Sequence, residues 1–265
     1  MSERDSGDEP RRIKSVGTVS DILRTIQFQD APTFVDVVDA IDLSKGTVHT
    51  YLSTLEAEGF VTRDEGVYRL GVRFIPMAET VRNETRLYRA AREEVETLAR
   101  ETQEYVHLTV ADRGREVTIE ERRGENAIAM DYHLRMREAP QHLHYTSTGK
   151  AMLAHFDQER VDRIIEAEGL VAQTDQTITD REELAAELAD IRDRGFAVND
   201  EEEVRGMRSV GAVVRGIEDD VAGAISVTAP KRRLSGDRFH TTVPELVMQA
   251  ANIIEVNLET AVLDV

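Results

Sequence analysis

The 265-residue chain contains no cysteine and only four lysines. Without cysteine, disulfide bonds, thiolate metal sites and a cysteine nucleophile are excluded. No apolar run reaches the roughly 20 residues of a membrane-spanning helix. Residues 1–10 are charged and lack the apolar segment of a secretory signal. We therefore expect a cytoplasmic protein with no membrane partner, and its length allows two domains.

The net charge of −18 is distributed unevenly. Residues 11–74 carry eight Lys or Arg and nine Asp or Glu, whereas residues 75–265 carry 24 and 38, a net charge of −14. An acidic, lysine-poor and cysteine-free chain is typical of a cytosol rich in salt, where screening weakens the self-repulsion of the surface. The composition therefore favours a halophilic source over an ordinary acidic cytosolic protein.

Residues 44–70 predict a helix followed by a small hairpin. Ser44 is a good N-cap, Gly59 is a good C-terminal stop, and apolar residues recur between them at helical spacing. Two short alternating runs follow, and Asp64-Glu65-Gly66 is expected to join them as a three-residue loop. Helices are also expected over residues 18–27 and from Thr33 onwards. Three helices and a hairpin form a winged helix-turn-helix, although a solvated helix and a surface hairpin are the plainer alternative.

In a winged helix the third helix enters the major groove of DNA, and the hairpin contacts the phosphate backbone. The candidate contacts are therefore the polar side chains of the predicted helix and the basic side chains of the hairpin. They are Ser44, Lys45, Thr47, His49 and Thr50 on the helix, and Arg63 and Arg69 on the hairpin. A double-stranded DNA operator is the expected partner.

The remainder predicts an α+β domain behind a connecting helix. The helical pattern over 76–101 is expected to bend near 83–87 and to offer a surface to a second subunit. Strands are expected over 105–111, 116–122, 127–134, 141–145, 196–199, 209–216 and 221–229, and helices over 148–156, 158–168, 181–194 and 242–263. This order favours one antiparallel sheet. The expected division is a disordered leader (1–11), a winged helix-turn-helix (12–73), a connecting helix (74–102) and a second domain (103–265).

No catalytic motif is present in the sequence. There is no nucleophile elbow, Walker loop, HExxH or dinucleotide fingerprint, so no catalytic residue, metal or cofactor is assigned. His142 and His144 could form a metal pair, but a site needs further ligands, and alternating strand residues are the simpler reading. The acidic run 200–203 could collect cations, although an acidic loop is the simpler reading there too.

Five stretches carry a resemblance to the IclR family of transcriptional regulators, which extends over residues 12–263. They are LSKGTVH (43–49), Leu55 with EGFV (58–61), LHYTSTGKAMLA (143–154), GFAVNDEE (195–202) and VAGAISVTAP (221–230). The resemblance implies a homodimer or homotetramer with a GAF-like effector-binding domain, acting as repressor or activator. Thr50 departs from the family, because many relatives carry arginine at this position of the recognition helix.

The resemblance also implies an effector pocket. The matching positions are Ser147, Thr148, Asn199, Met207, Ser209, Ser226 and Thr228. The start of a helix favours an anion, and hydroxyls two residues apart on a strand face the same side, so a small carboxylate or sugar acid fits. Asn199 stands where relatives often carry aspartate. From the residues alone, Ser226 and Thr228 would be core hydroxyls and Ser147 a helix cap.

Two other functions stay open at this point. The second domain could serve only for oligomerisation of a DNA-binding protein, or it could be an enzyme domain fused to a DNA-binding module. If the domain is a sensor, a ligand should stabilise the purified protein against heat. If it is an enzyme, a product should form.

Overall fold

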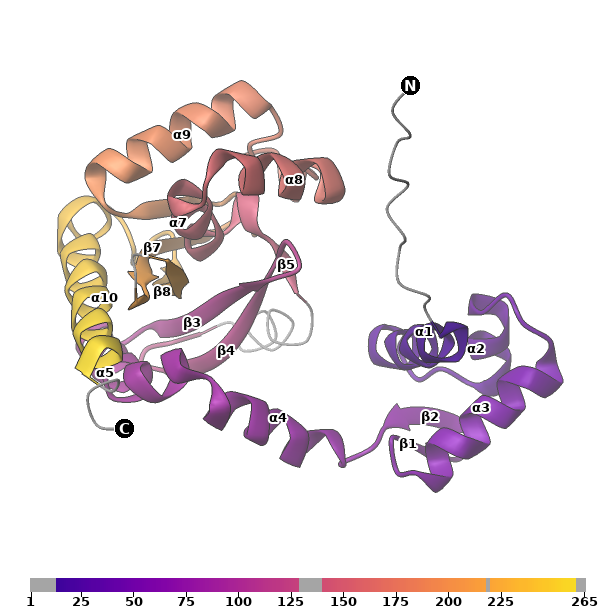
Figure 1. The fold of residues 1–265 in the computed structure, drawn as a ribbon. Coiled ribbons are helices and arrows are strands. Elements are labelled where there is room, and N and C mark those ends of the chain that lie inside the picture. Colours follow the sequence, from indigo (N-terminus) through magenta and orange to yellow (C-terminus); the bar gives the residue numbers. More distant parts are fainter. Residues whose placement is uncertain (1–12, 129–139, 218–219, 261–265) are drawn as a thin grey trace, which may run out of the picture. The chain divides into compact units, whose positions relative to one another are not determined.

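The computed structural model describes residues 13–128, 140–217 and 220–260 (Figure 1). The chain divides into two compact units, Met1–Val81 and Arg82–Val265. The expected leader, most of the expected strand 127–134 and the last residues of the expected C-terminal helix lie outside the described residues. Each unit is described separately below.

Helices and a hairpin form the first unit. Its elements are α1 (Lys14–Phe28), α2 (Phe34–Ala40), α3 (Lys45–Ala57), β1 (Val61–Asp64) and β2 (Val67–Leu70), and α4 (Phe74–Glu84) begins in it. The core contains Ile22, Ile26, Val37, Val48, Leu52, Leu55, Val61 and Tyr68. Every helix before the hairpin contributes to this core, which confirms the predicted winged helix-turn-helix.

Both ends of α3 form as the sequence predicts. At its start the Ser44 hydroxyl accepts a hydrogen bond from the Thr47 N–H at 3.2 Å. At its end Gly59 has a φ of +73°, and the Phe60 N–H donates to the Leu55 carbonyl at 2.8 Å. This 6→1 hydrogen bond and a left-handed glycine are the signature of a Schellman motif.

The hairpin loop is shorter than expected. Asp64 pairs directly with Val67, so the loop contains only Glu65 and Gly66. Both loop residues have positive φ, 48° and 87°, as in the type I′ turn that matches the twist of two strands. The expected three-residue loop is therefore wrong, because Asp64 belongs to the strand.

One antiparallel sheet organises the second unit, with strand order β5-β4-β3-β8-β7-β6. The strands are β3 (Tyr105–Asp112), β4 (Arg115–Arg123), β5 (Gln141–His142), β6 (Ala197–Asp200), β7 (Met207–Arg215) and β8 (Val221–Pro230). The helices are α5 (Arg86–Thr102), α7 (Ser147–His155), α8 (Gln158–Glu168), α9 (Arg181–Arg194) and α10 (Val243–Thr260). The predicted α+β class is confirmed.

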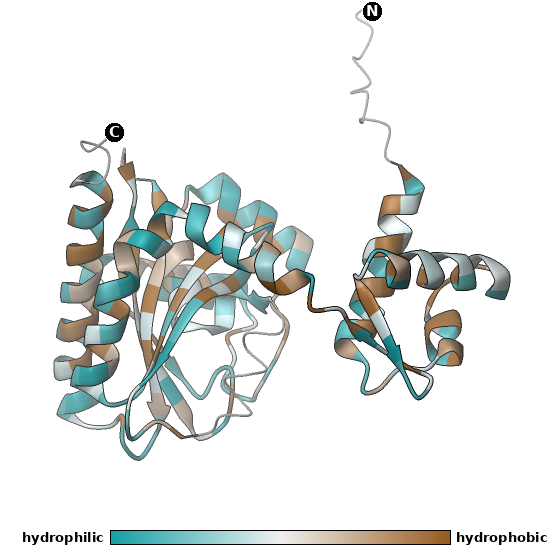
Figure 2. Ribbon diagram, turned by 90° about the horizontal axis from the view of Figure 1, so that it is seen from below, coloured by the Kyte–Doolittle hydropathy of each residue, from teal (hydrophilic) through white to brown (hydrophobic). Residues whose placement is uncertain are grey.

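Helices cover both faces of this sheet. Helices α5 and α10 pack on one face, where Val210, Ile225 and Val227 join the larger hydrophobic core. Helices α7 and α9 pack on the other, where Val213 and Ala224 join a second core. Figure 2 shows hydrophobic stretches along the strands between these two layers. Polar residues of the central strands are therefore buried, such as His107 on β3 and Ser226 on β8.

Two expected elements differ in the structure. The strand expected over 141–145 ends at His142, and Leu143–Tyr145 form a buried 3₁₀ turn closed by a hydrogen bond from the His142 N–H to the Tyr145 hydroxyl. The expected connecting helix is interrupted at Thr85, where ψ is 113°. Its second part, α5, packs on the sheet, so only α4 remains as a connecting element.

Two glycines let the start of α7 approach its neighbours closely. A Cβ on Gly149 would collide with the Leu143 carbonyl oxygen, and one on Gly211 would lie 2.9 Å from the Ser147 carbonyl carbon. Real Cβ atoms do not approach so closely, so each position requires glycine. As a result the N-terminus of α7 lies directly on β7.

We expect Gly149→Ala to destabilise the second unit by about 1–3 kcal/mol, because backbone atoms obstruct the added methyl group. Gly17 is the control, since it is also helical and has open space around its Cα. Gly17→Ala should stabilise the first unit by up to about 1 kcal/mol through helix propensity. Scanning calorimetry of the full chain measures both effects; an unchanged transition for Gly149→Ala would contradict the close packing.

Candidate functional site

The predicted DNA-contacting side chains of α3 are exposed and belong to two groups. Ser44, Thr47 and Thr50 line a groove of about 600 Å³ beside Val19 of α1, whereas Lys45 and His49 do not line it. The Thr50 hydroxyl donates to the Gly46 carbonyl at 3.0 Å. Its donor is therefore used within the helix, and Thr50 can offer a DNA base only an acceptor.

The two predicted wing arginines lie on opposite faces of the hairpin. Arg63 pairs with Tyr68, a core residue, and its guanidinium lies 5.4 Å from the Tyr68 ring centroid. Arg69 pairs with Thr62 on the other face, lies 4.0 Å from Asp64 and is 60% exposed. One surface of the wing therefore cannot present both arginines.

Arg73 was missed by the sequence reasoning. Its guanidinium donates to the Glu58 carbonyl at 2.5 Å and lies 4.8 Å from the Phe60 ring centroid. It therefore fastens the end of α3 to the segment that follows the hairpin. A single arginine after a strand gave no signal of this role.

Polar positions in the second unit form rows across one sheet face. Asn199 pairs with Ser209, and Ser209 pairs with Thr228. In the next row Ser226 pairs with Gly211 on one side and with His107 on the other. Residues opposite each other in neighbouring strands share a face. Because Gly211 lies against the start of α7, this is the face that α7 covers.

All seven predicted effector-pocket residues are buried, with exposed fractions between 1% and 9%. Met207 precedes Ser209 on the same side of β7, and Ser147 and Thr148 open α7 above that strand. Within the described chain, the hydroxyls of Ser147, Ser209 and Ser226 make no hydrogen bond. The structure therefore brings the predicted residues to one place and leaves three hydroxyls available for a partner.

Asn199 and Thr228 already have partners. The Asn199 amide donates to Glu203 at 3.3 Å, and its oxygen accepts the Glu202 N–H at 2.9 Å. The Thr228 hydroxyl lies 3.4 Å from His107 Nδ1. Asn199 thus holds the loop after β6, so its contribution to a ligand site includes fixing that loop.

A buried carboxylate that the sequence reasoning missed occupies the start of α7. Glu116 Oε2 accepts hydrogen bonds from the hydroxyls of Thr146 at 2.5 Å and Thr148 at 2.9 Å. Glu116 is 2% exposed. Burial raises the pKa of this carboxyl group, and the two threonine hydrogen bonds oppose the increase. The sequence alone gave no sign that α7 covers this face of β4.

His107 was also missed. It is 1% exposed, and its Nε2 lies 3.3 Å from a Glu121 carboxylate oxygen. Lys150 is 1% exposed and binds Glu202 at 2.6 Å and Glu187 at 3.6 Å. Burial raises the pKa of Glu202, and the Lys150 ammonium opposes the increase.

The two histidines considered for a metal do not form such a site with their neighbours. Their rings pack edge to face with their centroids 5.6 Å apart, and His144 Nε2 lies 3.0 Å from the Val171 carbonyl oxygen. Burial lowers the pKa of His144 to about 4. Among the described residues no group of three or more potential ligands is placed to hold a metal ion.

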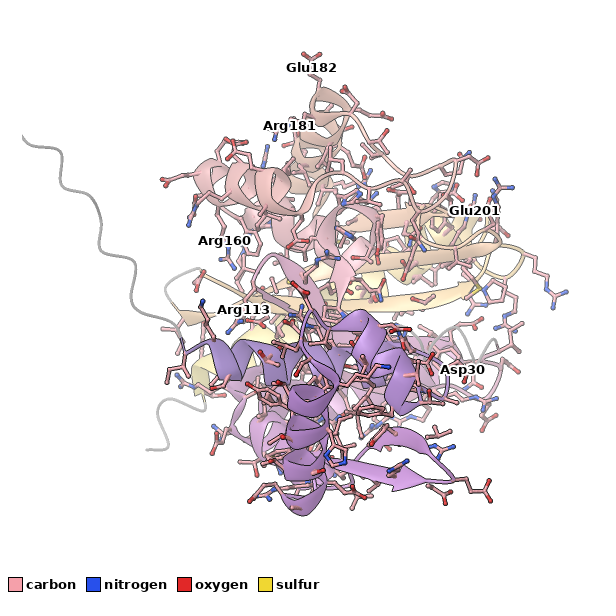
Figure 3. The ribbon with its side chains drawn as sticks, turned by 90° about the vertical axis from the view of Figure 1, so that its right-hand side faces the viewer. Asp30, Arg113, Arg160, Arg181, Glu182 and Glu201 are labelled. Atoms are coloured by element: carbon pink, nitrogen blue, oxygen red, sulfur yellow. The ribbon has the colours of Figure 1, made fainter. Side chains whose placement is uncertain are left out.

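Cations of the chain itself bind the acidic run after β6. Arg208 binds Asp200 in a bidentate pair at 2.6 and 2.7 Å, and Lys231 binds Glu201. Other surface charges point outward, such as Arg181 and Glu182 at the start of α9 (Figure 3). None of the described helices has the length and hydropathy to cross a membrane.

Comparisons with known proteins agree on both units. The family model for the IclR helix-turn-helix domain matches residues 17–65, and that for the bacterial transcriptional regulator IclR C-terminal domain matches residues 79–256. A probable HTH-type transcriptional regulator ArcR of Halobacterium salinarum is 44% identical over 98% of this chain and 99% of that protein. The HTH-type transcriptional regulator KdgR of Escherichia coli is 27% identical over 96% of each.

Solved structures show the same fold. IclR of Thermotoga maritima superposes with a TM-score of 0.72 at 23% identity and covers 92% of this chain and 98% of that one. An IclR homologue of Microbacterium hydrocarbonoxydans, solved with 4-hydroxybenzoate, superposes with a TM-score of 0.76 at 22% identity and covers 92% and 99%. The haloarchaeal relative agrees with the halophilic composition.

The raised pKa of Glu116 predicts a pH-dependent stability difference. A carboxyl group whose folded pKa lies above its ordinary 4.5 stabilises the fold at low pH, and this contribution is lost as the pH rises through the folded pKa. Glu116→Gln stays neutral and avoids the loss. The difference in melting temperature, Glu116→Gln minus the unmodified chain, should therefore increase as the pH is raised from about 4.5 and become constant once the pH exceeds the folded pKa. A pH series of melting curves tests this, with the exposed Glu259→Gln as control; a constant difference would contradict it.

Proposed function

The chain belongs to the IclR family of transcriptional regulators, and we propose that in the cytoplasm it controls a catabolic operon in response to a small metabolite. Its N-terminal domain is the DNA-binding domain and its C-terminal domain is the effector domain. The proposed effector is a carboxylate or sugar acid bound beneath α7. The proposed partner is a palindromic DNA operator.

The observation that carries this proposal is the set of unused hydroxyls of Ser147, Ser209 and Ser226 on one buried sheet face. Hydroxyl groups that the chain does not use for its own hydrogen bonds can bind a polar molecule or water. The homologue solved with 4-hydroxybenzoate supports a small carboxylate as ligand of this fold. A domain used only for oligomerisation would not need a buried cluster of unused donors.

On the DNA side, Lys45 and His49 are the proposed major-groove contacts on α3, together with Ser44, Thr47 and Thr50 at the groove beside α1. Arg69 is the stronger candidate for a phosphate contact, because it is exposed on the outer face of the wing, whereas Arg63 lies beside Tyr68. The N-terminal domain is close to neutral, so the domain that binds DNA does not itself repel it. At high salt, screening also weakens the repulsion between DNA and the acidic second domain.

A homodimer or homotetramer is the proposed assembly. Helix α4 has no buried residue and exposes Ile75, Met77 and Val81, which are 62%, 42% and 65% exposed. Met77 and Val81 are four residues apart and so lie on one side of the helix, and exposed apolar side chains there suit a second copy of the same helix. Two winged domains would then read half-sites roughly 34 Å apart, one turn of DNA.

Arg69→Ala tests the phosphate contact. Loss of one phosphate contact should weaken binding to all DNA sequences alike and lower the salt slope of affinity by about one, because one fewer counterion is released. Footprint titrations over a salt series measure that slope. The control Arg181→Ala removes an exposed arginine of the C-terminal domain and should leave the slope unchanged. An unchanged slope for Arg69→Ala would remove it from the interface.

Ser226→Ala tests the effector pocket. Melting curves of the purified protein with gluconate, glycerate and 4-hydroxybenzoate should identify a stabilising compound. Loss of one charge-assisted hydrogen bond should weaken that compound by about 1.5–3 kcal/mol, roughly ten- to a hundred-fold, while DNA affinity without it stays the same. Ser235→Ala, an exposed hydroxyl, is the control. Full affinity in both Ser226→Ala and Thr228→Ala would show that the pocket is wrong.

A further inference from the structure

The start of α7 is already occupied by a carboxyl group of the chain itself. The Thr146 and Thr148 hydroxyls at this helix terminus both donate to one carboxylate oxygen, Oε2 of Glu116. Helix N-termini favour negative charge, so this is the position where a ligand carboxylate would otherwise bind best. A second carboxylate there would meet both the like charge and a reduced supply of donors.

Glu116 differs from other buried glutamates in its partners. Glu104 binds Arg233 in a bidentate pair, Glu120 binds Arg122, and Glu202 binds Lys150. Glu116 is as deeply buried, yet no Lys or Arg forms an ion pair with it in the described part of the chain, and the ring of His107 is the charged partner that lowers its pKa. Besides the two threonine hydroxyls, the Gly149 N–H donates to Glu116. A carboxylate can accept about four hydrogen bonds, so Glu116 retains capacity for one more.

A second buried group points to a missing partner nearby. Thr109 is completely buried, and its hydroxyl has no hydrogen-bond partner in the described chain. Thr109 pairs with Ala224 and follows His107 by two residues on β3, so it shares the face that α7 covers. Two residues further along β3, Ala111 pairs with Glu116. The unpartnered hydroxyl therefore lies between His107 and Glu116. Together with Ser226, these residues form a row of polar side chains, here called the polar line, that runs from Ser226 past His107 and Thr109 to Glu116.

Resting on the proposed effector function, we propose that Glu116 is a specificity-determining residue of the effector pocket. The effector presents a hydrogen-bond donor, a hydroxyl or an ammonium group, to Glu116 and Thr109. A carboxylate of the same effector binds at the opposite end of the polar line, beside His107, Ser226 and Thr228. The effector class is therefore a hydroxy acid or amino acid, and a simple carboxylate is excluded.

This arrangement distinguishes ligands that carry a hydrogen-bond donor from those that lack one. A ligand that carries only a carboxylate leaves Glu116 and Thr109 buried without their partner, which is the mechanism by which polar sites reject analogues that lack a group. One that carries a carboxylate at both ends adds repulsion with Glu116. Replacement of the Glu116 carboxyl group by an amide should therefore weaken ligands with a terminal donor and reduce the penalty for the others.

Three six-carbon probes test the proposal. Gluconate carries hydroxyls, 6-aminohexanoate carries a terminal ammonium and hexanoate carries neither, while all three have one carboxylate. Calorimetry with the full chain at high salt should show binding of gluconate or 6-aminohexanoate, and whichever binds identifies the donor. Hexanoate should bind roughly ten- to a hundred-fold more weakly. Equal binding of hexanoate, or binding of none at millimolar concentration, would overturn the proposal.

Glu116→Gln should weaken the bound probe by roughly ten- to a hundred-fold and bring its affinity closer to that of hexanoate. If Ser226→Ala abolishes binding while Glu116→Gln leaves it unchanged, the pocket stands and the role of Glu116 is wrong. If neither variant alters the affinity of a probe that binds, both the pocket and the role of Glu116 fail.

Melting curves without probe show whether each variant is folded. Thr109→Val is the second variant, because it keeps the shape of the side chain and removes only the unpartnered hydroxyl. It should weaken the bound probe while the protein without probe melts at the same temperature or higher. Unaltered affinity in Thr109→Val and Glu116→Gln together would remove this end of the polar line from the site.

Discussion

The close contact between the N-terminus of α7 and the sheet is the constraint on which the effector domain depends. Gly149 and Gly211 permit it, because a side chain at either position would meet backbone atoms. The contact places the first turn of α7 over the polar rows of β7 and β8. It also converts that sheet face from a surface into an interior, so every polar residue on it needs an internal partner.

Those partners differ along the face. Near α9, Lys150 supplies a cation to Glu202, and the Asn199 side chain holds the same loop. In the middle, Ser209 and Ser226 have no partner in the described chain. At the far end, two threonine hydroxyls hold Glu116. The middle and the Glu116 end lie next to each other, whereas at the loop end Lys150 leaves one buried oxygen of Glu202, Oε2, without a hydrogen bond in the described chain.

Local signals in the sequence predicted most of the fold. Helices α8 and α9 begin and end where the sequence indicated, because Asp157 and Asp180 cap their starts and Gly169 and Gly195 follow their last residues. The interruption at Thr85 falls within residues 83–87, where the sequence predicted a bend and not a break. The errors lie where the structure depends on contacts between elements. The length of the hairpin loop depended on the register of its two strands, and Leu143–Tyr145 form a buried turn before α7.

The candidate site was less accessible to the same reasoning. Ser147, Ser209 and Ser226 were selected through the family resemblance, because a hydroxyl at a helix start or on a strand is ordinary by itself. Glu116 and His107 were missed, since alternation along a strand shows which residues share a face and not whether a helix covers it. Coverage by α7 is a property of residues more than thirty positions away. Only the folded structure therefore shows that Glu116 is buried without a Lys or Arg partner. That difference separates it from the buried glutamates that form ion pairs within the protein, and makes it a candidate for contact with a ligand.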